Sequence, residues 1–379
     1  TNLGRGGGLW ISGSPRTVDI QAGSQLSNNS ADDGGGLWTQ LSGNTVLNAN
    51  AATFSNNNAT FSGGGLSLGS GGQIQTFFNC DITGNNSSDL GGGVFTEARS
   101  AGNPRGSART TGIVIDTCQL EGNLAVNEGA GFYIDTPEML IRNSVVSNNN
   151  TTASGSDGAG IFQASGITRI RVCTISGNEA DPSSPADTSE VDGIFVQGGA
   201  VELRGTALCD ASTPELVDNP PYPSGSPVMV DFGLNDLVDC EPANLELLED
   251  GDSVSNIVNN MGFFDRTVIE LLPGTYQELS TIDVLGRNVS IIGLAADGDA
   301  SGVVIQGGDQ GAVVAARSGS EVWLECVTIT NGIGEQGNNH FGGVFVSGTP
   351  TKLHIDNCHI DANLNSGLVI DGGASPYVI

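Results

Sequence analysis

Lysine is almost missing from this chain, which has a single lysine, Lys352, and only 13 basic residues against 42 acidic ones. The formal net charge of −29 repels phosphate groups, so we expect no nucleic-acid partner and no attraction to anionic membranes. Long apolar runs are also missing, which excludes a membrane-spanning helix, so we expect no membrane insertion. An acidic, lysine-poor composition is common in secreted proteins and favours an extracellular or cell-surface location.

Glycine, by contrast, is abundant, and it recurs in clusters that are each followed by a hydrophobic triplet. The first four clusters begin at residues 6, 34, 63 and 91, so the intervals are 28, 29 and 28 residues. A fixed period of this size indicates a repeat architecture. Apolar residues alternate with polar ones inside the unit, as at Val18 and Ile20, which predicts short strands. Two or three short strands in about 28 residues fit one coil of a parallel β-helix.

A second phrase places an apolar residue two or three positions before an asparagine. Stacked at one turn of every coil, these asparagines would form a ladder of amide groups. The phrase occurs at Leu26/Asn29, Phe54/Asn57, Ile82/Asn85, Leu120/Asn123, Val146/Asn149, Ile175/Asn178 and Ile360/Asn363. A column of small residues precedes it, at Ser24, Ala52, Cys80, Cys118, Ser144, Cys173 and Cys358.

The paired phrases resemble the repeats of polymorphic outer membrane proteins, and they are similar to bacterial surface proteins with pectate-lyase-like β-helices. The resemblance covers roughly residues 1–205 and 300–379. It implies an all-β fold, a right-handed parallel β-helix solenoid. It says little about activity, because that superfamily contains lyases, hydrolases and adhesins.

The repeat is interrupted between about residues 205 and 300, where we expect a second β-helix to begin. A proline-rich stretch near 210–240 predicts an irregular closing segment. Val254, Ile257, Val258 and Met261 then form a helical stripe, with Asp252 or Ser253 as N-cap. This succession resembles the capped opening of pectate-lyase-like β-helices.

We therefore predict two tandem β-helices, residues 1–240 and 241–379, with a short capping helix at the second start. The alternative is one continuous solenoid with an insertion. Both ends of the sequence lie within repeats, so we expect a piece of a longer protein.

Seven cysteines divide into two groups. Most lie in or beside the column of small residues and are expected to be buried free thiols. Cys209 and Cys240 flank the proline-rich segment, and we predict a disulfide between them. Such a bond would indicate an oxidising compartment.

An aromatic column is predicted from the middle residue of the hydrophobic triplet. If the flanking aliphatic residues face the core, strand alternation directs these rings outward; the opposite interpretation places them inside. An outward stripe of rings predicts contact with a sugar, a neighbouring molecule or a covering loop. The candidate partner-binding or glycan-binding residues are Trp10, Trp38, Phe95, Tyr133, Phe162, Phe195 and Phe345.

An acidic column precedes the glycine clusters. Stacked carboxylates about 5 Å apart repel each other, and Ca²⁺ would relieve that repulsion because it accepts several oxygen ligands. The alternative is a row of solvated turns whose side chains diverge. The candidate calcium ligands are Asp33, Asp89, Glu128, Asp157 and Asp192.

Catalytic residues are not indicated by any motif. Of the three histidines, His340, His354 and His359, His354 shares one strand face with Asp356, but no third ligand follows at metal spacing. Cations are too scattered for a lyase, and we find no signature of polygalacturonases or pectate lyases. We therefore expect no enzymatic activity.

These observations together predict an extracellular structural or adhesive protein, a stalk or filament subunit of a larger surface assembly. Its expected partners are other copies or filament neighbours. The alternatives are a carbohydrate-binding module that uses the aromatic column, and a polysaccharide lyase or hydrolase of the pectate-lyase-like superfamily.

Overall fold

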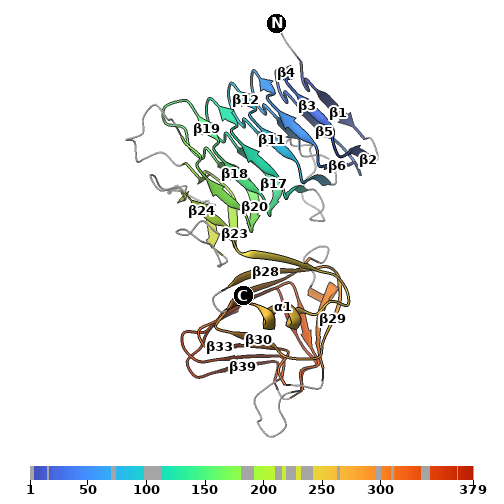
Figure 1. Ribbon diagram of the computed structural model, residues 1–379, viewed down its shortest axis with the longest axis vertical. Coiled ribbons are helices and arrows are strands. Elements are labelled where there is room, and N and C mark those ends of the chain that lie inside the picture. Colours follow the sequence, from blue (N-terminus) through green and yellow to red (C-terminus); the bar gives the residue numbers. More distant parts are fainter. Residues whose placement is uncertain are drawn as a thin grey trace. The chain divides into compact units, whose positions relative to one another are not determined.

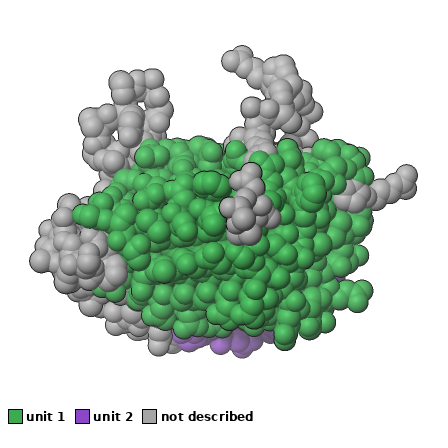
Figure 2. All heavy atoms as spheres, turned by 90° about the horizontal axis from the view of Figure 1, so that it is seen from above, with its two compact units in different colours: residues 1–242 green, residues 243–379 purple. Residues whose placement is uncertain are grey.

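The computed structural model describes residues 4–14, 17–69, 74–97, 112–180, 192–209, 216–218, 228–231, 242–262, 265–294, 300–308, 311–333, 342–364 and 366–378, with the backbone alone for 216–218, 228–231 and 375–378. The chain divides into two compact units, unit 1 (residues 1–242) and unit 2 (residues 243–379) (Figure 1, Figure 2). This division falls two residues from the predicted boundary at 240, and each sheet draws its strands from one unit.

Unit 1 winds through four short strands per coil, which stack into three parallel sheets. The first strands of successive coils are β1 (Leu9–Gly13), β5 (Leu37–Leu41), β9 (Leu66–Gly69), β13 (Val94–Glu97), β22 (Ile194–Val196) and β25 (Leu216–Asp218). The second strands are β2 (Thr17–Ile20), β6 (Val46–Asn50), β10 (Ile74–Phe78), β14 (Gly112–Asp116), β23 (Ala200–Arg204) and β26 (Val228–Asp231). In two coils, both strands fuse into β17 (Phe132–Arg142) and β20 (Ile161–Arg171), which joins the two ladders into one sheet.

The other two sheets of unit 1 complete each coil. The seven-stranded sheet contains β3 (Gln25–Ser27), β7 (Thr53–Ser55), β11 (Asp81–Thr83), β15 (Gln119–Glu121), β18 (Val145–Ser147), β21 (Thr174–Ser176) and β24 (Ala207–Cys209). The five-stranded sheet contains β4 (Ser30–Ala31), β8 (Asn58–Ala59), β12 (Asn86–Ser87), β16 (Leu124–Ala125) and β19 (Asn150–Thr151).

Successive coils stack in the register that the repeat predicts. The first apolar residue of each triplet pairs with its counterpart in the next coil, along Leu9, Leu37, Leu66, Val94, Phe132, Ile161 and Ile194. The prediction of an all-β parallel solenoid is therefore confirmed.

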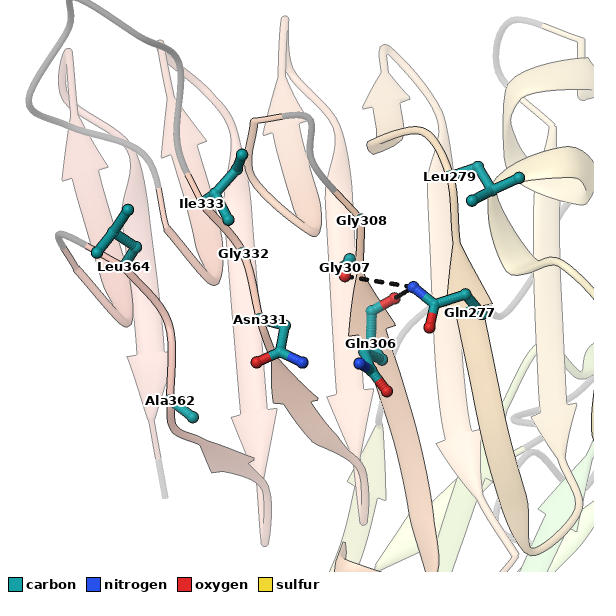
Figure 3. A pocket seen from close by; sticks show the side chains of 10 residues that line it. All are labelled: Gln277, Leu279, Gln306, Gly307, Gly308, Asn331, Gly332, Ile333, Ala362 and Leu364. Atoms are coloured by element: carbon teal, nitrogen blue, oxygen red, sulfur yellow. Dashed lines mark hydrogen bonds between the residues drawn. The ribbon is translucent and has the colours of Figure 1, made fainter.

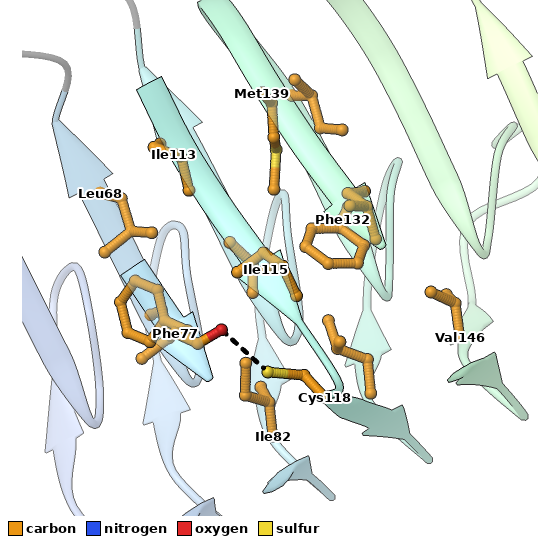
Figure 4. Close-up of a cluster of buried hydrophobic side chains, with 14 of the residues drawn as sticks. Leu68, Phe77, Ile82, Ile113, Ile115, Cys118, Phe132, Met139 and Val146 are labelled. Atoms are coloured by element: carbon orange, nitrogen blue, oxygen red, sulfur yellow. Dashed lines mark hydrogen bonds between the residues drawn. The ribbon is translucent and has the colours of Figure 1, made fainter. Parts of the chain in front are cut away.

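The core of unit 1 is a continuous file of apolar side chains inside the coils. Figure 4 shows Leu68, Phe77, Ile115 and Phe132 facing this interior from successive strands. Phe77 and Phe132 are fully buried, and each buried side chain of this size contributes about 1.5–3 kcal/mol to folding. Cys118 belongs to the same file and donates its thiol hydrogen to the Phe77 carbonyl at 3.3 Å.

The predicted asparagine ladder is present along six coils of unit 1. Each amide Nδ2 donates to the Oδ1 of the next asparagine at 2.9–3.1 Å, in the order Asn29, Asn57, Asn85, Asn123, Asn149 and Asn178. From Asn57 onward, each Nδ2 also donates to a backbone carbonyl one coil earlier, which satisfies its second hydrogen. The residue before each ladder asparagine has a positive φ, which asparagine and glycine tolerate: Asn28, Asn56, Gly84, Gly122, Asn148 and Gly177.

Unit 2 has three strands per coil in three parallel sheets. The six-stranded sheet contains β27 (Asn244–Leu248), β28 (Arg266–Leu271), β31 (Asn288–Gly293), β34 (Glu321–Glu325), β37 (Lys352–Asp356) and β40 (Ser375–Val378). The two four-stranded sheets contain β29 (Gly274–Glu278), β32 (Val303–Gly307), β35 (Thr328–Thr330) and β38 (His359–Ile360), and β30 (Ile282–Leu285), β33 (Val314–Arg317), β36 (Val344–Ser347) and β39 (Leu368–Asp371). A short 3-10 helix, η2 (Ala300–Gly302), precedes β32.

The predicted helix is α1 (Val254–Asn260), and it packs against β29 and β30, the first strands of their sheets (Figure 1). Ser253 is the N-cap, and its hydroxyl accepts the Asn256 N–H at 3.2 Å. Val254 and Val258 are fully buried in the core of unit 2. The side chain of Asn259 accepts the Asp283 N–H and donates to the Thr281 carbonyl, so it satisfies edge groups of β30. The helix thus covers one end of the apolar interior.

Candidate functional site

The aromatic column follows the first strands of the coils, on the face opposite the core. Trp10 pairs with Trp38, and Phe95, Tyr133, Phe162 and Phe195 pair in sequence along later coils. Their aliphatic neighbours lie in the interior cluster, whereas Phe162 and Phe195 form a separate cluster with Tyr133 and Ala164. The rings therefore point outward, and the interpretation that placed them inside is wrong.

An exposed stripe of rings, however, does not result. Trp10 is 62% exposed, Phe95 and Tyr133 are half-buried, and the remaining predicted rings are buried: Trp38, Phe162, Phe195 and Phe345. The predicted contact of these rings with a sugar, a neighbouring molecule or a covering loop stays a prediction, because alternation decides only the direction of a side chain and not what covers it.

The rings in the middle of the column cover one another. Phe95 and Tyr133 stack with centroids 5.4 Å apart, Tyr133 and Phe162 at 5.3 Å, and Phe162 and Phe195 at 5.2 Å. Each such pair contributes about 0.5–1.5 kcal/mol beyond the area it buries. Part of the column is therefore structural, and its accessible rings are the exposed Trp10 and the half-buried Phe95 and Tyr133.

The acidic column runs beside this stack. Gly34, Gly91, Gly129 and Gly158, which follow four of the acidic residues, have a positive φ, and a Cβ on Gly129 would lie 2.9 Å from the Tyr133 Cα. Burial, and then the charges of Asp89 and Asp157, raise the pKa of Glu128 above its ordinary value. Burial, followed by Glu128, raises the pKa of Tyr133 to about 12. The carboxylates and the rings thus share one electrostatic environment.

The acidic residues have separate partners and do not converge. Asp33 pairs with Arg5 at 3.7 Å, Asp89 accepts the Asn127 amide at 2.7 Å, and buried Asp192 accepts the Ala180 N–H at 2.7 Å. Within the described ranges, no three His, Cys, Asp or Glu side chains are grouped so that they could hold a metal ion. The calcium prediction therefore gains no geometric support there.

Two arginines lie over rings of the aromatic column, which the sequence analysis did not foresee. The Arg5 guanidinium is 4.9 Å from the Trp38 ring centroid, and that of Arg317 is 5.8 Å from Phe345. The sequence offered one indication: Arg5 stands immediately before the first glycine cluster, where later coils have an acidic residue. In the structure, Arg5 forms a parallel backbone β-bridge with Asp33.

The histidines give no catalytic arrangement in the described part of the chain. His354 stacks on Trp323 with ring centroids 3.6 Å apart, and its Nε2 lies 3.3 Å from a carboxylate oxygen of Glu321 on β34. Its charged neighbour is thus in the adjacent coil, rather than Asp356 on its own strand. His359 lies on β38, and His340 is outside the described residues.

Cys209 is disulfide-bonded, whereas Cys80, Cys118, Cys173, Cys326 and Cys358 are free. The predicted partner, Cys240, lies outside the described residues. The pairing of these two cysteines stays a prediction.

A groove of about 470 Å³ lies on one face of unit 2. Gln277 on β29, Gln306 on β32 and Asn331 after β35 present amide groups along it, over a floor of Gly307, Gly308 and Gly332 (Figure 3). Leu279 and Leu364 stand at its two ends and are 80% and 60% exposed. Its described lining contains no charged side chain. No motif in the sequence marked this groove, because its residues lie in four different coils.

Comparisons with protein-family profiles and with curated proteins find no match to this sequence. The resemblance to polymorphic outer membrane proteins and pectate-lyase-like proteins therefore stays a prediction at the level of family. None of the described helices is long and apolar enough to cross a membrane.

Proposed function

We propose that this chain is an extracellular structural or adhesive protein, a stalk or filament subunit that holds a rigid surface. The observation that carries the proposal is the asparagine ladder of unit 1. It links six coils by hydrogen bonds between side chains that are buried from Asn57 onward, in addition to the backbone ladders. A buried network whose amide groups are hydrogen-bonded makes a solenoid stiff along its axis.

The disulfide at Cys209 and the composition favour a location outside the cytoplasm. Structural disulfides persist in oxidising compartments. The charge of −29 keeps a large exposed surface soluble and monomeric until a specific contact forms. Both properties suit a protein that presents its surface to the exterior.

Electron microscopy and light scattering of the purified chain test the filament role. We expect rods that join end to end, with a length distribution that shifts upward with protein concentration. Because open coil ends expose unpaired strand edges, joining should occur at the ends and not along the sides. A monodisperse monomer at high concentration would contradict the filament role.

A second candidate function is the binding of an uncharged polysaccharide in the groove of unit 2. Amide side chains at coil spacing above a glycine floor can exchange hydrogen bonds with sugar hydroxyls, and Leu279 and Leu364 offer apolar contacts. A glycan array probes this directly. Gln306→Ala should abolish any hit, whereas Gln119→Ala, at an exposed position on unit 1, should leave it unchanged. An array without hits would remove this candidate.

A further inference from the structure

The first coils of unit 1 show how this chain binds a guanidinium group. Arg5 lies over the Trp38 ring at 4.9 Å, and its Nε is 3.7 Å from the Asp33 carboxylate. The ring supplies a negative π face, and the carboxylate supplies the opposite charge. One member of the aromatic column and one of the acidic column thus hold a cation between them.

Unit 2 repeats the arrangement with different residues. Arg317 lies 5.8 Å from the Phe345 centroid, and its Nε is 3.6 Å from the Asp283 carboxylate. Phe345 is the middle residue of the triplet Val344–Val346 on β36, as Trp38 is of its triplet on β5. Two independent coils therefore place a planar cation over the column ring with a carboxylate beside it.

The middle of the aromatic column in unit 1 contains more rings and more carboxylates than the sites at Trp38 and Phe345. Phe95 and Tyr133 are half-buried, and Tyr133 is stacked between Phe95 and Phe162, so both of its faces are covered. Phe95 pairs with Ser67 in the preceding coil, so its other face has no ring of the column against it. Burial raises the pKa of Tyr133, and Glu128 and Asp89 lie close enough to raise it further. Among the described residues, the cation–π contacts are those of Arg5 and Arg317, and neither reaches this stretch. Glu128 experiences the charges of Asp89 and Asp157, and a cation would remove that repulsion.

We propose that Phe95, Tyr133, Asp89 and Glu128 form a docking surface for arginine side chains of a basic segment in a partner protein. Charge complementarity selects this occupant, because a cationic segment is attracted to the carboxylates of a chain whose net charge is −29. Arginine fits better than lysine, because a planar guanidinium stacks on a ring and forms parallel hydrogen bonds with a carboxylate. The inference adds a partner to the proposed structural role. It rests on that role only in that the stacked coils present this face to a partner.

The test measures binding of a fluorescent peptide of alternating arginine and serine to the full chain by fluorescence anisotropy. The control peptide has citrulline, a neutral analogue, at every arginine. We expect Glu128→Gln and Phe95→Leu each to weaken binding of the arginine peptide about threefold to tenfold at low salt. Glu246→Gln makes the same charge change at an exposed position of unit 2 and should leave binding unchanged.

Three outcomes would overturn the proposal: equal binding of the citrulline peptide, an equal effect of Glu246→Gln, or no effect of Glu128→Gln. Arg99, Arg105 and Arg109 lie outside the described residues, so the titration is repeated with all three changed to glutamine. The same dependence on Glu128 is expected there, and its absence would also overturn the proposal. Because Glu128→Gln leaves the ladder untouched, loss of peptide binding is separable from loss of rod assembly.

Discussion

The carboxylate of Glu278 accepts the backbone N–H of Val254 at 2.7 Å, at the first turn of α1. Its other oxygen accepts the Ser255 N–H and the Ser253 hydroxyl, both at 3.0 Å. Glu278 is only 1% exposed. A buried negative charge is thus stabilised by the free N–H groups and the positive end of the helix, and it joins the helix to β29.

Glu278→Ala should destabilise unit 2 by about 2–4 kcal/mol, because it leaves two buried N–H groups without acceptors. Glu278→Gln should cost less, since its amide oxygen still accepts one of them. Hydrogen exchange followed by mass spectrometry would show lost protection in α1 and β29. Glu246→Ala, at an exposed position on β27, is the control and should have no effect. Unchanged protection in Glu278→Ala would contradict the cap.

Asn123→Ala should destabilise unit 1 by about 2–4 kcal/mol, because the residue is buried and lies in the middle of the ladder. Its Nδ2 donates to Asn149 and to the Ile82 carbonyl at 2.9 Å each, and its Oδ1 accepts from Asn85 at 3.0 Å. Thermal unfolding followed by circular dichroism measures the effect. Asn86→Ala removes an exposed amide one coil earlier and should change the midpoint little; equal losses in both variants would exclude a special role for the ladder.

The stability of unit 2 should fall in acid through Glu321. The adjacent His354, and then Lys352, hold the pKa of Glu321 below its ordinary value of 4.5, although burial opposes them. Because the folded pKa is the lower one, the ionised carboxylate stabilises the folded unit above pH 4.5, and this contribution is lost as the pH falls through the folded pKa.

Glu321→Gln should therefore lower the free energy of unfolding of unit 2 at neutral pH by less than about 1 kcal/mol, because the pair is partly exposed. The difference from the native chain should disappear in stronger acid. A difference that stays constant from neutral pH to about pH 3 would contradict the assignment.

The free thiols should differ widely in their rate of alkylation by iodoacetamide. Cys80, Cys118 and Cys173 are buried, and burial raises the pKa of Cys173 to about 12. Burial likewise raises the pKa of the half-buried Cys358 to about 12. We expect Cys326, at a half-buried turn, to react first, since the thiolate is the reactive form. Peptide mapping by mass spectrometry gives the order of alkylation, and unfolding in urea should abolish the differences in rate. Early labelling of Cys173 in the native chain would contradict its burial in the column of small residues.

The repeat and the strand alternation were sufficient to predict the solenoid, the asparagine ladder and the helix with Asp252 or Ser253 as its N-cap, and the structure selects Ser253. These depend on local rules: period 2 for strands, left-handed angles for asparagine and glycine, and side-chain capping of a helix. A second turn, beside the column of small residues, carries a weaker signal, because its positive-φ positions hold Ala51, Thr117 and Val172 as well as Asn79 and Asn143.

Sequence by itself determined the winding of this chain and placed the rings together on one face of their strands, because both follow from a period that every coil repeats. Tertiary structure alone decided which rings stay accessible, which carboxylates pair with an arginine, and where three side-chain amides line the groove of unit 2. These properties depend on contacts between coils that are about 28 residues apart in the chain, and no rule about neighbouring residues carries that information.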